Sequence, residues 1–205
     1  MLHTAAPRCG RCLSQPPHYD ATIAALAYGD PLDHAVHAFK YHHALGLARF
    51  FSGLLDDALS AAVAGGHDSI GNTSSAGSTL GPGRIDLIIP LPLAPARLSE
   101  RGFNQALELA RSIAARRRIA LNARAVRRIR DTPPQAQLPW SERARNIQGA
   151  FVCDIPLKGL RVAVVDDVMT TGASLNEIAR VLKDAGAVQV TNWVVARALP
   201  QASRS

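Results

Sequence analysis

The chain has 205 residues, 47% of them hydrophobic, which is enough for one α/β domain with a buried core and a small appendage. It has no apolar run near the roughly 18 residues of a membrane span, no secretory signal and only three cysteines, so we expect a cytoplasmic protein without disulfides. The net charge of +7 is concentrated between Arg97 and Arg145, where 12 arginines face four acidic residues, and it indicates a polyanionic partner such as a pyrophosphate or a nucleic acid.

The first 20 residues contain two cysteines at the spacing of a zinc knuckle. Cys9 and Cys12 form the C-x₂-C pair. Structural zinc needs four ligands, and His3 and His18 are the residues nearby that would complete a set. With only one cysteine pair present, we do not expect bound zinc.

Residues 21–63 are predicted to be helical. Asp30 and Pro31 suit the cap and first turn of a helix, and apolar residues then recur at helical spacing, first as far as Phe39 and again from residue 47 to residue 59. The same segment holds four histidines, which a solvated helix face explains better than a metal site. They are His34, His37, His42 and His43.

Residues 64–84 are rich in glycine and serine and almost free of large apolar residues. Such a sequence buries little surface to offset the entropy of ordering it, so we predict a flexible linker or an inserted loop. The core of the fold is then expected to span residues 85–198, with residues 199–205 as a tail.

From residue 85 onward, strand and helix patterns alternate. The predicted strands are apolar runs at residues 85–91, 119–129, 151–154, 161–165 and 188–196. Helical faces surround Leu109 and Ile178, and the second helix begins with a capping-box pattern at Ser174 and Glu177 and ends near Gly186. Strands joined by helices imply an α/β fold whose mostly parallel sheet binds ligands at the carboxyl ends of its strands. Residues 131–149, which lack a helical stripe, are predicted to form a long loop.

The most informative stretch, residues 162–174, reads VAVVDDVMTTGAS. Four apolar residues bury a strand, Asp166 and Asp167 follow at its carboxyl end, and small and hydroxyl residues then wrap the start of a helix. The backbone N–H groups at a helix start suit a phosphate dianion. The two carboxylates suit hydrogen bonds from two vicinal hydroxyls.

This stretch resembles the 13-residue signature of type I phosphoribosyltransferases. The resemblance implies that Asp166 and Asp167 hold the ribose 2′- and 3′-hydroxyls of phosphoribosyl pyrophosphate, and that the following turn holds its 5′-phosphate. An ordinary strand-to-helix turn with two solvated aspartates is the alternative. The residues implied for this site are Asp166, Asp167, Val168, Met169, Thr170, Thr171, Gly172, Ala173 and Ser174.

Further matches extend the resemblance over about residues 84–198. They are Leu91-Pro92-Leu93, Arg97, Arg101-Gly102-Phe103-Asn104-Gln105, Thr132, Gln135, Leu138, Arg143, Asn146 and Gly149-Ala150-Phe151. With these matches the chain resembles the ComF branch, the competence-associated phosphoribosyltransferase-like proteins. The resemblance implies a type I phosphoribosyltransferase-like fold, with residues 21–63 as a helical hood. Many ComF proteins begin with a four-cysteine zinc module, so residues 1–20 look like a remnant of it, as a truncated start or a degenerated finger.

Two pairs of arginines are predicted to contact the pyrophosphate. Arg97 and Arg101 follow the strand at residues 85–91, at the same sheet end as the acidic pair, and guanidinium groups bind phosphate oxygens bidentately. A solvated basic turn is the alternative. The loop at residues 131–149 occupies the place of the lid in type I enzymes, where Arg143 and Arg145 would bring charge to the leaving group on closure.

Three other side chains each have two alternative roles. Trp140 either stacks on a base or pins the lid to the hood, and we favour pinning because lone tryptophans usually pack. The resemblance implies that Lys40 and Tyr41 contribute to the hood over the acceptor, with a surface lysine as the alternative.

The resulting hypothesis is phosphoribosyl transfer to an unidentified nitrogen acceptor, with Asp166, Asp167, Arg97 and Arg101 as catalytic residues and Mg²⁺ bridging the pyrophosphate and the ribose hydroxyls. One alternative is a module that binds phosphoribosyl pyrophosphate or a nucleotide without catalysis. Another, implied by the resemblance, is a DNA-uptake factor that works with protein partners and tracks single-stranded DNA through the arginines between residues 111 and 130. That run contains no aromatic residue for base stacking, and genomic base composition explains the excess of 20 Arg over 3 Lys equally well. The sequence does not indicate an oligomeric state.

Overall fold

The computed structural model describes residues 15–41, 46–64, 84–130 and 146–198. The strands of its main sheet are β1 (Ala21–Ala27), β2 (Leu87–Pro90), β3 (Ala120–Leu121), β6 (Arg161–Met169) and β7 (Gln189–Arg197). They lie in the order β1-β7-β6-β2-β3, and all neighbouring pairs are parallel. The helices are α2 (Leu32–Tyr41), α3 (Gly46–Ala64), α4 (Pro95–Arg101), α5 (Gln105–Arg117) and α7 (Ala173–Asp184). The predicted α/β fold with a parallel sheet is confirmed.

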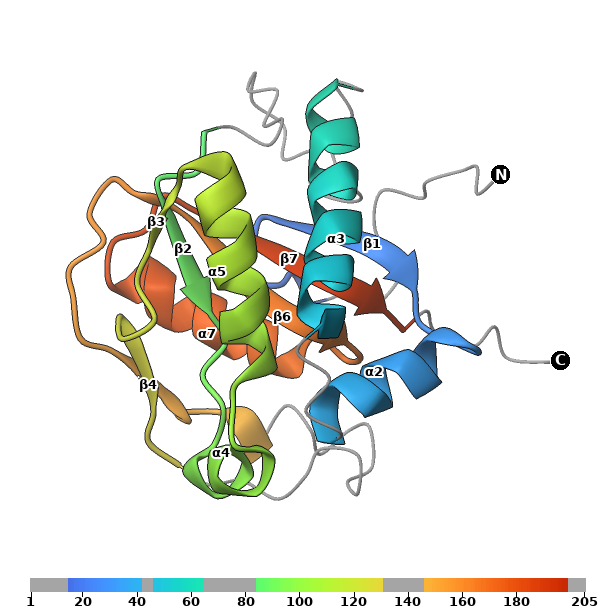
Figure 1. The fold of residues 1–205 in the computed structure, drawn as a ribbon. Coiled ribbons are helices and arrows are strands. Elements are labelled where there is room, and N and C mark those ends of the chain that lie inside the picture. The colour runs from blue at the N-terminus through green and yellow to red at the C-terminus, as the bar shows by residue number, and fades with distance from the viewer. Residues whose placement is uncertain (1–14, 42–45, 65–83, 131–145, 199–205) are drawn as a thin grey trace, which may run out of the picture.

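Helices cover both faces of this sheet, with α3 and α5 in front of it and α7 behind it in Figure 1. The front layer packs Phe39, Phe51 and Ile113 against the sheet, and the rear layer packs Leu175 and Ile178 against it. All five side chains are fully buried, which stabilises the fold by roughly 1.5–3 kcal/mol each. Burial on both faces also explains why β2 and the first part of β6 are continuous apolar runs rather than alternating ones.

A two-stranded antiparallel sheet lies beside the main one and consists of β4 (Val126–Arg128) and β5 (Phe151–Cys153). The sequence predicted one weak strand over residues 119–129. The structure divides that segment, because β3 pairs with β2 in the main sheet whereas β4 pairs with β5. Apolar periodicity alone does not show where a strand changes partner.

Residues 21–27 correct the prediction of a wholly helical segment at residues 21–63. They form strand β1, which pairs with β7 from Ala21 opposite Thr191 to Ala27 opposite Arg197. The alanine-rich sequence has little strand propensity of its own. Residues 21–27 form a strand because they pair with β7, whose backbone groups would otherwise be unpaired at the sheet edge. The helices predicted in the same segment are present as α2 and α3.

The start of α7 also differs from the predicted capping box. The N-cap is Gly172, with a left-handed backbone (φ 75°) and no side-chain cap. Glu177 instead accepts hydrogen bonds from the backbone N–H of Gly149 at 2.8 Å and from Arg180 at 2.7 Å. The carboxylate therefore ties the loop before β5 to α7. At the other end of the helix, Gly186 follows the last turn with φ 102°, as predicted.

Several predictions fall outside the described residues. These include the cysteine pair Cys9 and Cys12, His3, His42 and His43, residues 65–83 of the linker predicted at residues 64–84, the lid residues Trp140, Arg143 and Arg145, and the tail at residues 199–205. Within the described part of the chain, no helix is both long enough and apolar enough to cross a membrane.

Candidate functional site

A cavity of about 790 Å³, called the main cavity below, opens at the carboxyl ends of β2 and β6. Asp166 and Asp167 line it from β6, and Thr170 and Ser174 line it from the turn and the start of α7. Arg97 and Arg101 line it from α4, a helix that the sequence patterns did not predict. The structure thus places residues from two distant segments around one cavity, while their roles in binding remain predictions.

The acidic pair lies within β6, whose pairing with β7 continues as far as Met169. The backbone N–H of Asp167 donates to Asp166 Oδ1 at 2.8 Å, and that of Val168 donates to Asp167 Oδ1 at 2.7 Å. Burial, followed by the charge of Asp167, raises the pKa of Asp166 well above its usual range, and the charge of Lys40 opposes this shift. The two neighbouring carboxylates therefore need positive charge close to them.

Lys40, in the last turn of α2, supplies that charge. Its Nζ lies 3.0 Å from Asp167 Oδ2, and the two side chains are only 23% and 12% exposed. At this distance the contact is an ion pair between two largely buried groups. Burial lowers the pKa of Lys40, but the charges of Asp167 and Asp166 outweigh burial and raise it overall.

The turn after β6 holds the start of α7 in place. Thr171 Oγ1 accepts a hydrogen bond from the backbone N–H of Ala173 at 3.1 Å, and Gly172 takes the left-handed conformation that the turn requires. Met169 is buried in the rear core. Of the residues predicted for the turn, Val168, Thr170 and Ser174 line the main cavity, whereas Met169, Thr171, Gly172 and Ala173 do not.

Arg101 is held in position by three contacts. Its guanidinium group donates to Gln105 at 3.1 Å and to the Tyr41 hydroxyl at 3.3 Å, and it lies 5.0 Å from the centre of the Tyr41 ring. Gln105 in turn donates to the carbonyl oxygen of Lys40 at 3.4 Å. The end of α2 and the start of α5 are thereby joined around the cavity.

Several residues that line the main cavity received no role from the sequence, among them Tyr28, Asn104 and Gln105. Asn104 caps α5 by accepting from the backbone N–H of Ala106, and it donates to the carbonyl oxygen of Leu91 at 3.0 Å. The capping role of Asn104 could have been predicted from the sequence, because an asparagine directly before a helical run of apolar residues is a favoured N-cap. Tyr28 follows β1, so the strand had to be known before this tyrosine could be placed.

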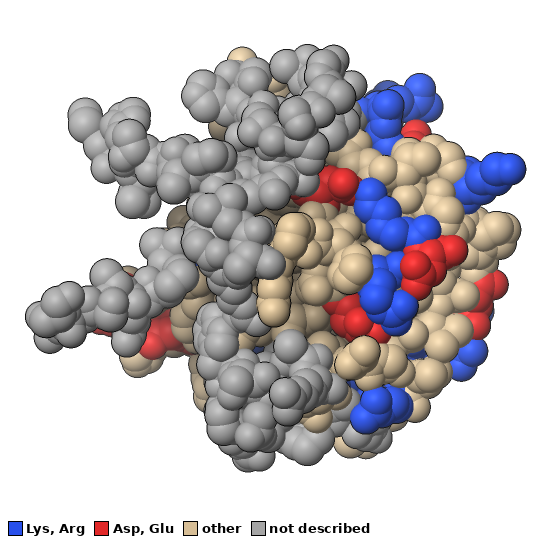
Figure 2. All heavy atoms as spheres, turned by 180° about the vertical axis from the view of Figure 1, so that it is seen from behind, with Lys and Arg blue, Asp and Glu red and all other residues tan. Residues whose placement is uncertain are grey.

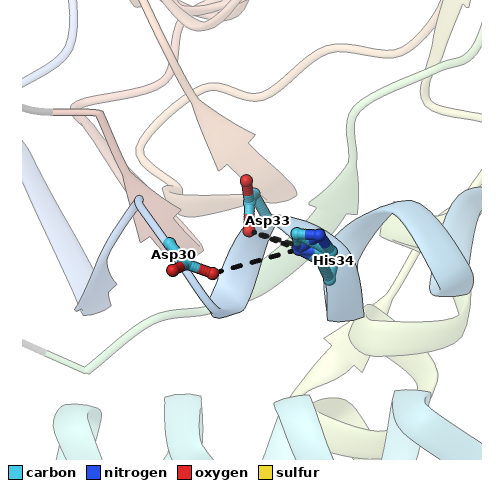
Figure 3. A group of neighbouring side chains, drawn as sticks. All are labelled: Asp30, Asp33 and His34. Atoms are coloured by element: carbon cyan, nitrogen blue, oxygen red, sulfur yellow. Dashed lines mark hydrogen bonds and ion pairs between the residues drawn. The ribbon is translucent and has the colours of Figure 1, made fainter.

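A second cluster, at the start of α2, consists of Asp30, Asp33 and His34 (Figure 3). His34 Nδ1 lies 3.2 Å from Asp33 Oδ1 and 4.0 Å from Asp30 Oδ1. The side chains of Asp30 and His34 are more than three-quarters exposed, and none of the three lines the main cavity. Asp30 and His34 therefore lie on a solvated helix face.

Comparison with curated proteins gives relatives that match almost the whole chain. The DNA utilization protein YhgH of Salmonella typhi is 34% identical over 201 residues, which are 96% of this chain and 80% of that protein. Competence protein F of Haemophilus influenzae is 31% identical over 200 residues, with 96% and 81% covered. The chain belongs to the ComF family. YhgH of Escherichia coli K12, 32% identical over 197 residues, is a further relative of this ComF protein. A comparison with models of known families finds no match.

Among solved structures, the ComF protein is similar to a purine phosphoribosyltransferase from Pyrococcus horikoshii and to the protein TT1426 from Thermus thermophilus. The first is 16% identical, with 78% of this chain and 93% of the other covered and a TM-score of 0.32. The second is also 16% identical, with 77% and 86% covered and a TM-score of 0.40. At these scores the likeness adds nothing to the description of the fold, which rests on the strand order itself.

Proposed function

We propose that this ComF protein binds phosphoribosyl pyrophosphate with Mg²⁺ in the main cavity and transfers the phosphoribosyl group to a nitrogen acceptor. One observation carries the proposal: the acidic pair of β6 and the start of α7 line the same cavity as Arg97 and Arg101. A ligand with vicinal hydroxyls at one end and phosphates at the other matches these donors and acceptors.

Each part of that ligand has a matching group in the chain. Asp166 and Asp167 accept hydrogen bonds from the ribose hydroxyls, and the turn ending at Ser174 binds the 5′-phosphate at a helix N-terminus. Arg97 and Arg101 bind the pyrophosphate through their guanidinium groups.

The carboxylates that line the cavity are suitable ligands for Mg²⁺ that arrives with phosphoribosyl pyrophosphate. Mg²⁺ prefers oxygen ligands and usually takes one or two carboxylates together with substrate phosphates. Asp166, Asp167 and Glu100 are the carboxylates that line the cavity among the described residues. When bound, Mg²⁺ neutralises charge on the pyrophosphate and so makes it a better leaving group.

In the proposed transfer, a nitrogen lone pair forms a bond to the anomeric carbon of the ribose. The bond from that carbon to the pyrophosphate oxygen breaks, and its electron pair leaves with the pyrophosphate. The acceptor nitrogen then gives up a proton. Arg97 and Arg101 stabilise the charge that develops on the departing pyrophosphate.

The test is the change in Tm when phosphoribosyl pyrophosphate and Mg²⁺ are added. A ligand at about 100 times its Kd should raise the Tm of a chain of this size by roughly 5–10 °C. Asp167→Asn should remove most of this rise because it weakens the ribose contact. Asp184→Asn, the same substitution on the exposed side of α7, should retain it. An equal rise in Asp167→Asn and the wild type would contradict the ribose assignment.

Binding without transfer is the alternative for the same cavity. A screen for pyrophosphate release with purine, pyrimidine and amine acceptors separates the two. Release with any acceptor supports transfer, whereas silence across a broad panel, together with a clear Tm rise, supports a sensor of phosphoribosyl pyrophosphate or a nucleotide.

A second candidate function is direct binding of single-stranded DNA, favoured by the names of relatives as a DNA utilization protein and a competence protein. The basic residues between Arg111 and Arg130 would track the phosphate backbone. We also propose a cytoplasmic place of action, in keeping with the chain's three cysteines.

A further inference from the structure

The strongest unassigned feature is the ion pair between Lys40 and the acidic pair of the main cavity. The lysine belongs to α2 in the N-terminal segment, and the aspartates belong to β6, more than 120 residues later in the sequence. A lysine this well buried is uncommon unless it is paired. The buried and paired position of Lys40 therefore indicates a role in the site rather than in solubility.

The surrounding contacts fix the backbone that carries Lys40. The neighbouring Phe39 is fully buried and packs against Phe51 and Phe103, with ring centres 5.6 and 6.0 Å away. Gln105 donates to the carbonyl oxygen of Lys40. The ammonium group thus starts from an anchored point directly beside the carboxylates.

Charge in the cavity decides what else can bind there. Among the described residues, four basic and three acidic side chains line it: Lys40, Arg97, Arg101 and Arg128, with Glu100, Asp166 and Asp167. Without Lys40, the carboxyl oxygens of Asp166 and Asp167 would be open to a hard divalent cation, which prefers such oxygen ligands. With Lys40 3.0 Å from Asp167, a second cation at this place meets a like charge and finds one carboxylate oxygen already paired.

We infer that Lys40 is an internal counter-ion that keeps free divalent metal off the acidic pair, so that the metal enters the main cavity only together with its polyanionic ligand. The inference rests on the proposed function for the identity of that ligand. It adds a specificity-determining residue to the site, because Lys40 sets the order in which metal and ligand bind. A polyanion compensates for the repulsion that Lys40 and the arginines exert on a bare metal ion.

The test uses Mn²⁺ alone, without phosphoribosyl pyrophosphate. Mn²⁺ takes the same carboxylate and water ligands as Mg²⁺, and its free form is counted by electron paramagnetic resonance. We expect Lys40→Met, which keeps the length of the side chain but removes its charge, to bind Mn²⁺ at least about tenfold more tightly than the wild type. Lys40→Arg, which keeps the charge, should behave like the wild type.

Two further variants keep the result interpretable. Lys40→Gln serves as a second neutral variant should Lys40→Met fail to fold, as checked by circular dichroism. Adding Asp167→Asn to Lys40→Met should abolish the gained affinity, because the gain requires both carboxylates. If neither neutral variant binds Mn²⁺ more tightly than the wild type, the inference is wrong.

This outcome is independent of the proposed function. A gain of Mn²⁺ affinity in Lys40→Met with no effect of phosphoribosyl pyrophosphate on the wild-type Tm would support the counter-ion and reject the ligand. A Tm rise in the wild type with no gain in the neutral variants would support the ligand and reject the counter-ion.

Discussion

The carboxyl groups of Asp166, in β6, and Glu177, in α7, have pKa values that are shifted in opposite directions. Burial and the charge of Asp167 raise the pKa of Asp166. Burial also acts to raise the pKa of Glu177, but hydrogen bonds from Arg180 and from the Gly149 N–H outweigh it, so the pKa of Glu177 is lowered overall. Ionised Asp166 therefore destabilises the folded protein, whereas ionised Glu177 stabilises it.

The substitution Asp166→Asn tests this cost. The folded protein keeps the Asp166 proton at a pH where the unfolded chain has lost it, so wild-type stability falls as pH rises from about 3.9 towards the raised pKa. The asparagine variant lacks this loss. We expect it to be more stable than the wild type near neutral pH, by on the order of 1 kcal/mol, and the advantage to vanish in acid. Urea unfolding across that pH range measures the difference.

Glu177→Gln provides the contrast. Its lowered pKa means that the stabilisation is present above about 4.3 and is lost as pH falls through the folded-state value, so this variant should be less stable near neutral pH by about 1–3 kcal/mol. The deficit should shrink in acid. The stability difference from the wild type should rise with pH for Asp166→Asn and fall with pH for Glu177→Gln. If both differences changed in the same direction, one of the two pKa shifts would be wrongly assigned.

At the scale of the element, the turn into α7 depends on one glycine. Gly172 has φ 75°, and a Cβ there would lie 2.6 Å from Cε of Met169, the end of a flexible side chain. The side chain can move, whereas the left-handed backbone cannot change without moving the helix start. The conformation itself therefore limits this position to glycine.

We expect Gly172→Ala to destabilise the protein by about 1–2 kcal/mol and to weaken the Tm response to phosphoribosyl pyrophosphate. Gly53→Ala is the matched control, because Gly53 lies inside α3 and its Cβ would meet only Arg116 Nη1, at 3.8 Å. That substitution should instead stabilise the protein by about 0.5–1 kcal/mol. Equal effects of the two substitutions in urea unfolding would contradict the role of the left-handed turn.

At the scale of the whole molecule, much of the positive charge is already paired. Arg111, Arg117 and Arg127 each form an ion pair with a carboxylate within the described part of the chain. Figure 2 shows the face that lies behind the sheet in Figure 1, where basic and acidic side chains are interspersed rather than gathered by sign. On α7, Arg180 pairs with Glu177, and Lys183 pairs with Asp20.

Any DNA contact must therefore come mainly from other arginines, such as Arg116, Arg118 and Arg124, for which no ion pair is present among the described residues. If the protein tracks single strands by charge, log Kd should depend steeply on log salt, and replacing all three arginines by glutamine should reduce the slope by about 2. Arg127→Gln, which removes an already paired guanidinium, should change it less. A flat slope in the wild type would exclude electrostatic tracking.

Part of the main cavity could be predicted from local sequence patterns. The acidic pair and the turn to Ser174 were predictable, because apolar run, carboxylates and small residues follow one another within a single segment. That Arg97 and Asp166 line the same cavity was predictable in outline, because parallel strands present their carboxyl ends at one sheet edge. The ion pair of Lys40 with Asp167 was not, since no local pattern relates α2 to β6.

The α/β class and the strand, turn and helix start from Val162 to Ser174 could be predicted from the sequence, because they depend on residue spacing along the chain. The strand at Ala21–Ala27 could not be predicted in this way, since the hydrogen bonds that hold it come from β7. The same holds for the charge beside the acidic pair, because Coulomb interactions depend on distance in space and not on separation in sequence.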